Sequence, residues 1–210
     1  MLNKKIFYDN IDLTLIGGFF MANSKIIIVE GAQGAGKTTI TDYIRYFLKY
    51  TNLYRLSGTS DSTIKGKEKA TLMYDTLLDY MEKMENQSIN LLFDRTFFTE
   101  ENYTRLGYKQ YSFSDIYYKL VERLNKMDFD IYYITLYLKD TSLYEKRLER
   151  KDKALPDYAK FKAENSINQQ KVYLEMADEL IKIAPNIKVY KIDSGKNLNE
   201  IEKEVKEILE

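Results

Sequence analysis

Short runs of apolar residues alternate along the chain with longer stretches in which apolar residues recur every three or four positions. The short runs are typical of buried strands, and the longer stretches are typical of helices that pack on one side. Strands are predicted at 26–29, 53–56, 89–93, 131–138 and 187–192. Helices are predicted at 39–48, 67–86, 96–106, 114–126, 141–151, 158–184 and 198–209. Because helices separate the strands, the pattern predicts an α/β fold with a five-stranded parallel sheet and helices on both faces.

The helix predicted at 67–86 is expected to turn one apolar side toward the core. The apolar residues at helical spacing on that side are Leu72, Leu77, Tyr80, Met81 and Met84. This spacing therefore predicts which residues of the helix contact the sheet.

Residues 31–38, between the first predicted strand and the first predicted helix, read Gly-Ala-Gln-Gly-Ala-Gly-Lys-Thr. This sequence matches GxxxxGK[ST], the phosphate-binding loop (P-loop) of nucleoside triphosphatases. In such a loop the backbone N–H groups surround a phosphate chain at the positive end of a helix dipole. Lys37 would reach the β- and γ-phosphates of ATP, and the Thr38 hydroxyl would ligate Mg²⁺. The residues predicted to bind ATP are Gly31, Gln33, Gly34, Ala35, Gly36, Lys37, Thr38 and Thr39.

Composition excludes several other chemistries. The 210 residues include no cysteine and no histidine, so disulfides, thiolate nucleophiles and His-based triads are impossible. Lys+Arg and Asp+Glu both number 32, and the resulting net charge of zero argues against stable binding of nucleic acid. Catalysis must therefore rely on Lys, Arg, carboxylates, hydroxyls and a bound metal ion.

The chain is expected to form one domain at 25–210, because its length suits one α/β domain and it has only two prolines. Residues 1–24 are expected to be an N-terminal extension. Its apolar run 13–21 resembles a weak signal peptide, but the adjoining P-loop and the absence of cysteine favour a cytoplasmic protein. No stretch reaches the roughly 18 apolar residues of a membrane span, so no membrane partner is expected.

Asp94 and Arg95 directly follow the apolar run 89–93. Ligands of an open parallel sheet bind beyond the carboxyl ends of its strands, where both side chains should emerge. Asp94 is suited to contact the water shell of Mg²⁺ or an acceptor hydroxyl, and Arg95 is suited to clamp a phosphate. The alternative is an ordinary turn with a solvated ion pair.

Four cations gather near the end of the helix predicted at 141–151, namely Arg147, Arg150, Lys151 and Lys153. Cations at a helix C-terminus stabilise the helix through its dipole, which requires no ligand. Phosphoryl transfer, however, needs positive charge over the migrating γ-phosphate, and a lid supplies it. We therefore predict a short cationic lid around 147–160, with Arg147 and Arg150 closing over the transferred group.

Two of the 19 tyrosines are candidates for contact with a nucleotide base. The rings of Tyr74 and Tyr103 are suited to stack on any base, because every base has a π-face. The alternative is that these rings fill half-buried positions, as tyrosines commonly do.

Several of these motifs together resemble thymidylate kinases. Residues 29–39 look like the opening of that family, and Asp94-Arg95 followed by Thr99, Asn102 and Tyr103 has the spacing of its DRY helix. Further similarity lies at 130–138, 173–177 and 192–197, so the resemblance covers about 25–210. It implies that Thr99 and Tyr103 bind the acceptor. It also implies that the loop containing Ser194, Gly195 and Lys196 binds adenine.

The departures from that family concern the acceptor. Gln33 stands where thymidylate kinases usually have an acidic residue near the acceptor sugar, and 55–59 lacks the Glu and Pro of their REPGGT turn. Tyr74 lines up with their base-stacking Phe, but Leu78 falls where an acceptor-binding Arg is expected. Thr104 replaces a Gln. The ATP half of the pattern is therefore intact, whereas the acceptor half is altered.

The sequence predicts ATP-dependent phosphoryl transfer to a nucleoside monophosphate, dTMP or a related deoxynucleotide. Lys37 would hold the donor phosphates, Thr38 and Asp94 the Mg²⁺ ion, and Arg95 the acceptor phosphate. Tyr74, Thr99 and Tyr103 complete the predicted acceptor site. Two alternatives stay open, a deoxynucleoside kinase that phosphorylates a 5′-hydroxyl and a non-catalytic ATP-binding module. The expected partner is a nucleotide, and a homodimer is compatible with the sequence.

Overall fold

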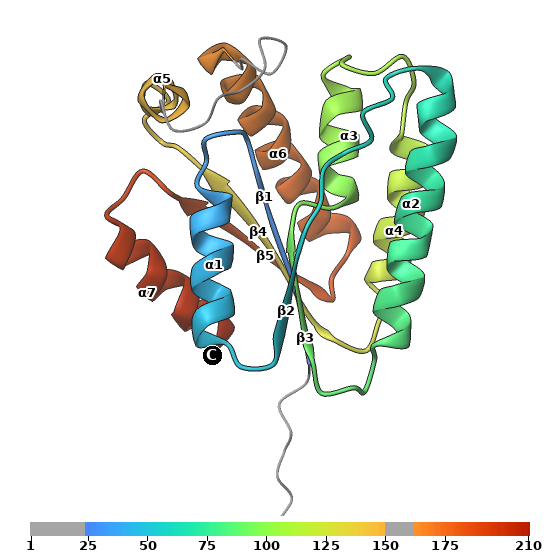
Figure 1. The fold of residues 1–210 in the computed structure, drawn as a ribbon, viewed down its shortest axis with the longest axis horizontal. Helices are drawn as coiled ribbons and strands as arrows, with labels where there is room; N and C mark the ends of the chain where they lie inside the picture. The colour runs from blue at the N-terminus through green and yellow to red at the C-terminus, as the bar shows by residue number, and fades with distance from the viewer. Residues whose placement is uncertain (1–23, 150–161) are drawn as a thin grey trace, which may run out of the picture.

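The computed structural model describes residues 24–149 and 162–210, and these form a single sheet covered by helices (Figure 1). The strands are β1 (Lys25–Gly31), β2 (Thr51–Arg55), β3 (Asn90–Asp94), β4 (Asp130–Tyr137) and β5 (Ile187–Asp193). All neighbouring pairs are parallel, and the strand order is β2-β3-β1-β4-β5. The predicted fold class is confirmed.

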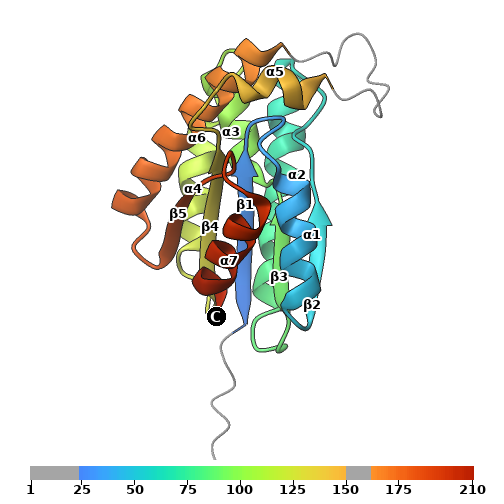
Figure 2. The same ribbon diagram turned by 90° about the vertical axis from the view of Figure 1, so that its left-hand side faces the viewer.

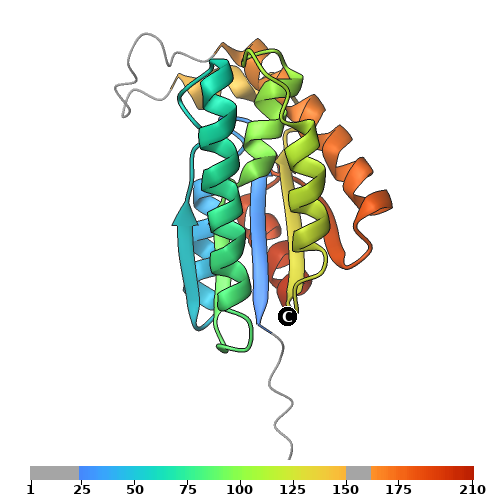
Figure 3. The ribbon, with the colours of Figure 1, turned by 90° about the vertical axis from the view of Figure 1, so that its right-hand side faces the viewer.

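Helices cover both faces of the sheet. Their bounds are α1 (Lys37–Phe47), α2 (Ile64–Lys83), α3 (Phe97–Arg105), α4 (Ser114–Leu124), α5 (Leu143–Leu148), α6 (Ala163–Ile183) and α7 (Leu198–Leu209). Helices α1 and α7 lie in front of the sheet in Figure 2, and α2, α3 and α4 lie in front of it in Figure 3. Helix α6 packs with the α2–α4 layer, and the short α5 lies at the carboxyl edge of the sheet (Figure 1).

Strand β1 shows why the short apolar runs are continuous rather than alternating. Ile26 and Ile28 pack into the core beneath α2, α3, α4 and α6, whereas Ile27 and Val29 pack into the core beneath α1 and α7. Successive side chains of a strand point to opposite faces, so a central strand buried on both faces needs apolar residues at every position.

The sequence assigned one residue of α2 to the wrong side. Leu72 was expected in the core, but its side chain is 71% exposed. The buried stripe of the helix is Ala70, Tyr74, Leu78 and Met81. These residues follow one another at intervals of four, four and three, which keeps them on one side of a helix, and Leu72 lies off that line.

Two predicted features fall partly or wholly outside the described residues. The N-terminal extension does so except for residue 24, and the lid does so from residue 150 onward, Arg150 included. The helix predicted at 158–184 is described from Ala163. Across residues 24–149 and 162–210, no helix combines the length and apolar character that crossing a membrane requires.

The register of the strands brings the predicted functional segments to one edge. Val29 of β1 pairs with Asp94 at the end of β3, and Gly31 pairs with Leu136 of β4. The P-loop and Asp94 therefore emerge side by side at the carboxyl ends of the central strands, where ligands of such sheets bind.

Candidate active site

The P-loop has the backbone conformation that its glycines permit. Gly31, Gly34 and Gly36 have φ angles of 143°, 82° and 90°, a region that disfavours side chains. A Cβ on Gly31 would also lie 2.5 Å from the carbonyl oxygen of Leu136, so no larger residue fits there. Helix α1 begins directly after Gly36, and its first N–H groups face the loop, as anion binding at a helix N-terminus requires.

A cavity of about 610 Å³ opens in front of this loop. Predicted site residues make up more than half of its lining. They are Gln33, Gly34, Gly36, Lys37, Thr38, Thr39, Asp94, Arg95, Arg147, Ser194 and Lys196. Arg55 and Leu56 line it beside Asp94, and Ile40, Leu148, Leu198 and Ile201 supply apolar surface near Ser194. The cavity is therefore polar along the P-loop and partly apolar beyond it, which suits a nucleotide.

Lys37 lies buried at the back of the P-loop. Its ammonium group donates hydrogen bonds to the carbonyl oxygens of Gly31 at 2.8 Å and Ala32 at 2.9 Å. Burial and, to a smaller extent, the nearby Arg95 lower the pKa of Lys37 to about 7, against the opposing effect of Asp94 and Glu30. Two cations close together in one cavity favour the binding of an anion.

Thr38 and Asp94, the residues predicted to hold Mg²⁺, lie next to each other at the P-loop. The Thr38 hydroxyl is 3.4 Å from Oδ2 of Asp94, and Asp94 is 6% exposed. Mg²⁺ is usually bound by one or two protein oxygens together with water and substrate phosphates, so this pair fits. Among residues 24–149 and 162–210, no three acidic, His or Cys side chains gather into a metal site.

Arg95 reaches the cavity from the turn after β3. Its backbone has φ 74°, unusual for a residue other than glycine, and its N–H donates to the carbonyl oxygen of Val29 at 3.1 Å. Burial lowers the pKa of Arg95, but Tyr103, Tyr173 and other neighbours raise it overall, so the guanidinium stays charged. It is suited to hold a phosphate opposite Lys37.

Arg147 joins α5 to the P-loop. Its guanidinium donates to the carbonyl oxygen of Gly34 at 3.1 Å and to the carbonyl oxygen of Ser194 at 2.6 Å. It also lies 3.4 Å from the Ser194 hydroxyl. Arg147 therefore connects the P-loop with the predicted adenine loop. Lys196 of that loop lines the cavity, whereas the Gly195 N–H donates to the Asp193 side chain at 2.9 Å.

The other predicted acceptor residues, Tyr74, Thr99 and Tyr103, are not part of the lining of this cavity. Tyr74 is fully buried, its ring meets the edges of Phe97 and Phe113, and its hydroxyl has no hydrogen-bond partner within the described part of the chain. Thr99 is 1% exposed and donates to Glu30 at 2.8 Å. Tyr103 is half-buried beside Arg95. Their roles in acceptor binding stay predictions.

Leu78 belongs to the core rather than to an acceptor site. It is 0% exposed, in the same cluster as Tyr74 and Met81. The structure thus gives a packing reason for the leucine that departs from the thymidylate kinase pattern.

Two buried glutamates near the site escaped the sequence interpretation. Glu30 and Glu100 are both 0% exposed. Glu100 accepts hydrogen bonds from the backbone N–H of Thr59 at 2.9 Å and from the Tyr111 hydroxyl, and it pairs with Lys109 at 3.4 Å. Lys109 also donates to the Thr59 carbonyl oxygen, so these contacts tie the loop after β2 to the loop after α3. The position of Glu30 directly before the P-loop could have marked it as a functional residue. No sequence feature marked Glu100, because its partners are distant in sequence.

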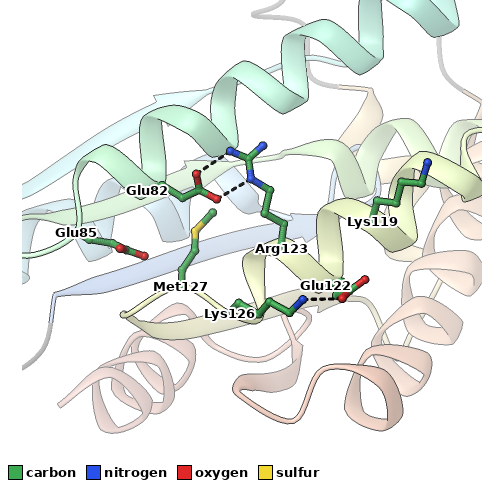
Figure 4. A pocket seen from close by; sticks show the side chains of 7 residues that line it. All are labelled: Glu82, Glu85, Lys119, Glu122, Arg123, Lys126 and Met127. Atoms are coloured by element: carbon green, nitrogen blue, oxygen red, sulfur yellow. Dashed lines mark hydrogen bonds and ion pairs between the residues drawn. The ribbon is translucent and has the colours of Figure 1, made fainter.

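A second cavity of about 550 Å³ lies between α2 and α4, away from the P-loop (Figure 4). Figure 4 shows two ion pairs in its lining, Arg123 with Glu82 and Lys126 with Glu122. A lining in which three carboxylates accompany three cations does not favour an anionic nucleotide. The cavity at the P-loop is therefore the candidate active site.

No protein-family model matches the chain, and no curated protein sequence matches it. Among solved structures it is similar to thymidylate kinase from Candida albicans, with a TM-score of 0.59 and 17% identity over 89% of this chain and 91% of that chain. It is also similar to deoxyadenosine kinase from M. mycoides with bound dATP, with a TM-score of 0.57 and 19% identity over 88% and 98%. The same kinase with bound dCTP gives a TM-score of 0.54 and 21% identity over 88% and 98%. The chain thus shares its fold with these kinases.

Proposed function

We propose that this protein transfers the γ-phosphoryl group of ATP to a nucleoside monophosphate, with dTMP or a related deoxynucleotide as acceptor. The observation that carries the proposal is that two cationic side chains, the buried Lys37 and the half-buried Arg95, line one cavity. Lys37 enters from the P-loop and Arg95 from the turn after β3, and each is close enough to affect the charge of the other. Two cations facing one space suit two phosphates that must approach each other despite their charge.

Each residue has a role in this reaction. The P-loop N–H groups and Lys37 hold the donor phosphates, and Arg95 holds the acceptor phosphate so that one of its oxygens faces the γ-phosphorus. The bond from that oxygen to phosphorus forms as the bond to the β–γ bridging oxygen breaks, giving ADP and a nucleoside diphosphate. Thr38 and Asp94 would hold a Mg²⁺ ion, which would neutralise charge on the phosphates. Arg147 and the adenine loop orient the base of ATP.

A second candidate is a deoxynucleoside kinase, and the similarity to deoxyadenosine kinase over 88% of the chain supports it. Such an enzyme needs a carboxylate base for the 5′-hydroxyl. The two candidates for this role are Asp61, in the loop between β2 and α2, and Asp94, at the end of β3. Asp61 pairs with Lys69 at 2.5 Å and accepts from Thr63 at the start of α2, so Asp94 is the better placed of the two.

The test is an ADP-release assay with ATP and Mg²⁺ against the common nucleosides and their 5′-monophosphates. The proposal expects turnover with one or more monophosphates and little with the matching nucleosides. Efficient phosphorylation of nucleosides, with monophosphates inert, would establish the second candidate instead. ATP binding without any transfer would favour a non-catalytic module. Lys83→Ala, at an exposed position at the end of α2, serves as the matched control for Lys37→Ala in each assay.

A further inference from the structure

Glu30 is a buried carboxylate that the roles above do not use. It directly precedes Gly31 and is 0% exposed. Its Oε1 accepts hydrogen bonds from the backbone N–H of Thr96 at 2.7 Å and from the Thr96 hydroxyl at 3.2 Å. Its Oε2 accepts one from the Thr99 hydroxyl at 2.8 Å. One side chain thus ties the strand that enters the P-loop to the start of α3.

The hydrogen bonds continue from Thr99 to α6. The hydroxyl of Tyr173 lies 2.9 Å from the hydroxyl oxygen of Thr99. Because Thr99 gives its single proton to Glu30, Tyr173 is the donor in this second bond. Glu30 therefore stands at the end of a chain of hydrogen bonds that joins β1, α3 and α6, the elements around Arg95.

The backbone of Arg95 is held in a strained conformation by the same contacts. A non-glycine residue in the left-handed region is strained, and this conformation persists only when the surroundings hold it there. The N–H of Arg95 donates to Val29 at 3.1 Å, and the next N–H, that of Thr96, donates to Glu30 at 2.7 Å. Such strain is characteristic of functional sites. Here the strained backbone conformation sets the position from which the side chain of Arg95 extends.

Charge acts in the same direction as geometry. Lys37 and Arg95 repel each other, and the carboxylate of Glu30 attracts both. The other titratable groups that face Glu30 are hydroxyls from four helices and strands: Tyr74 of α2, Tyr103 of α3, Tyr133 of β4 and Tyr173 of α6. Glu30 thus helps to keep the two cations close together.

We propose that Glu30 is a positioning residue for phosphoryl transfer. Its carboxylate fixes Arg95 relative to Lys37 and the P-loop, so that the acceptor phosphate faces the γ-phosphate in one orientation. Because Glu30 is enclosed, it acts through Thr96, Thr99 and Arg95 and touches neither substrate. This inference rests on the proposed function.

The test compares four variants with the wild-type protein. Glu30→Gln keeps the size of the side chain and removes its charge, and Thr99→Val removes the hydroxyl that links Glu30 to Tyr173. Thr99→Ser restores that hydroxyl. Glu101→Gln is the matched control: Glu101 is also 0% exposed, but it binds Arg105 at 2.7 Å and Ser114 at 2.7 Å instead. For each protein we would measure kcat, the KM of the acceptor, the Kd of ADP and the melting temperature.

We expect Glu30→Gln and Thr99→Val to lower kcat about a hundredfold, because a displacement of about 1 Å at the reacting groups has an effect of that size. The acceptor KM should rise, whereas the Kd of ADP should change little. Thr99→Ser and Glu101→Gln should keep kcat within a few-fold of wild type. This pattern distinguishes a positioning role from a loss of stability. Glu101→Gln lowers stability, but Glu101 does not line the cavity.

Three results would overturn the inference. The first is a wild-type kcat in a folded Glu30→Gln protein. The second, which applies if that variant does not fold, is a wild-type kcat in Thr99→Val. Equal losses of ADP binding and kcat would show a merely structural role for Glu30. A wild-type protein that transfers phosphate to no acceptor would instead remove the proposed function, and the inference with it.

Discussion

The P-loop and the cluster of contacts around Glu100 are built from residues at very different distances along the chain. From Gly31 to Thr39 the loop and the start of α1 are consecutive, and Lys37 binds carbonyl oxygens only five and six positions away. On the other side, Glu100 binds Thr59, 41 positions earlier, and Lys109 closes the same loop across 50 positions. We call these the donor side and the acceptor side, after the function proposed above.

This difference has a physical consequence. The donor side needs a short sequence with glycines where φ is positive and a lysine at a fixed spacing, so it can be transferred between proteins as one unit. The acceptor side depends on loops from several elements, and substitutions in any of them change its shape.

The largest expected effect is on the donor side. Lys37→Ala should lower kcat by about a thousandfold or more, because it removes a charge aimed at the transferred phosphate. Since Lys37 is buried at a cost, its loss should not lower the free energy of unfolding markedly. A coupled ADP-release assay and a thermal melt measure both quantities, with Lys83→Ala as control. Transfer at wild-type rates by a folded Lys37→Ala protein would contradict the assignment of the donor side.

The next effect concerns the contact that closes the acceptor side. Lys109→Met should lower the free energy of unfolding by about 3 kcal/mol, because it leaves the buried carboxylate of Glu100 without its cation. Lys109 is 6% exposed and Glu100 is 0% exposed. The matched control is Lys67→Met, whose pair with Asp115 is 31% and 58% exposed and should cost less than about 1 kcal/mol.

Urea unfolding of these two variants, with ADP binding as a second readout, sharpens the comparison between the sides. The Lys109 variant should keep the wild-type Kd of ADP while its acceptor KM rises. Equal stability losses in the two variants would mean that the buried pair does not hold the acceptor side together.

Arg95→Lys is expected to have a moderate effect, confined to the acceptor. A guanidinium matches a phosphate with two hydrogen bonds and an ammonium does not, so the loss should be roughly 1.5–3 kcal/mol, or about tenfold to a hundredfold in kcat/KM. ATP binding should change little. Unchanged kinetics with monophosphates would show that Arg95 does not hold the acceptor phosphate.

Particular residues show what the sequence could and could not predict. The strands, the parallel sheet and the P-loop follow from local patterns, and the register then brings Asp94 beside the loop, as expected from the rule for parallel sheets. The side of α2 that packs in the core was less certain, because apolar residues occur around much of that helix, and Leu72 was assigned wrongly.

The acceptor side was harder to predict because its contacts are long-range. Nothing near Glu100 in the sequence indicates that Thr59, Lys109 and Tyr111 surround it. Glu30 had a local signal, its position before Gly31. Its hydrogen-bond partners Thr96 and Thr99, however, lie 66 and 69 positions later in the sequence. Polar residues in a core become recognisable only when their partners are known.

The smallest expected effect is a change of stability with pH. It tests the protonation state of Glu30, which lies between the two sides. Burial raises the pKa of Glu30 from 4.5 to about 7, against the hydrogen bonds of Thr99 and Thr96 and the charge of Lys37. Between these values the folded protein retains a proton that the unfolded chain has lost, so the contribution of Glu30 to stability falls as pH rises from about 4.5 to 7. Glu30→Gln lacks this proton, so its melting temperature minus that of wild type should increase by a few degrees between pH 5 and pH 7. If the difference in melting temperature stays constant over this range, Lys37 and Arg95 keep Glu30 ionised throughout. The contact between the two sides would then include a carboxylate that is charged at every pH tested.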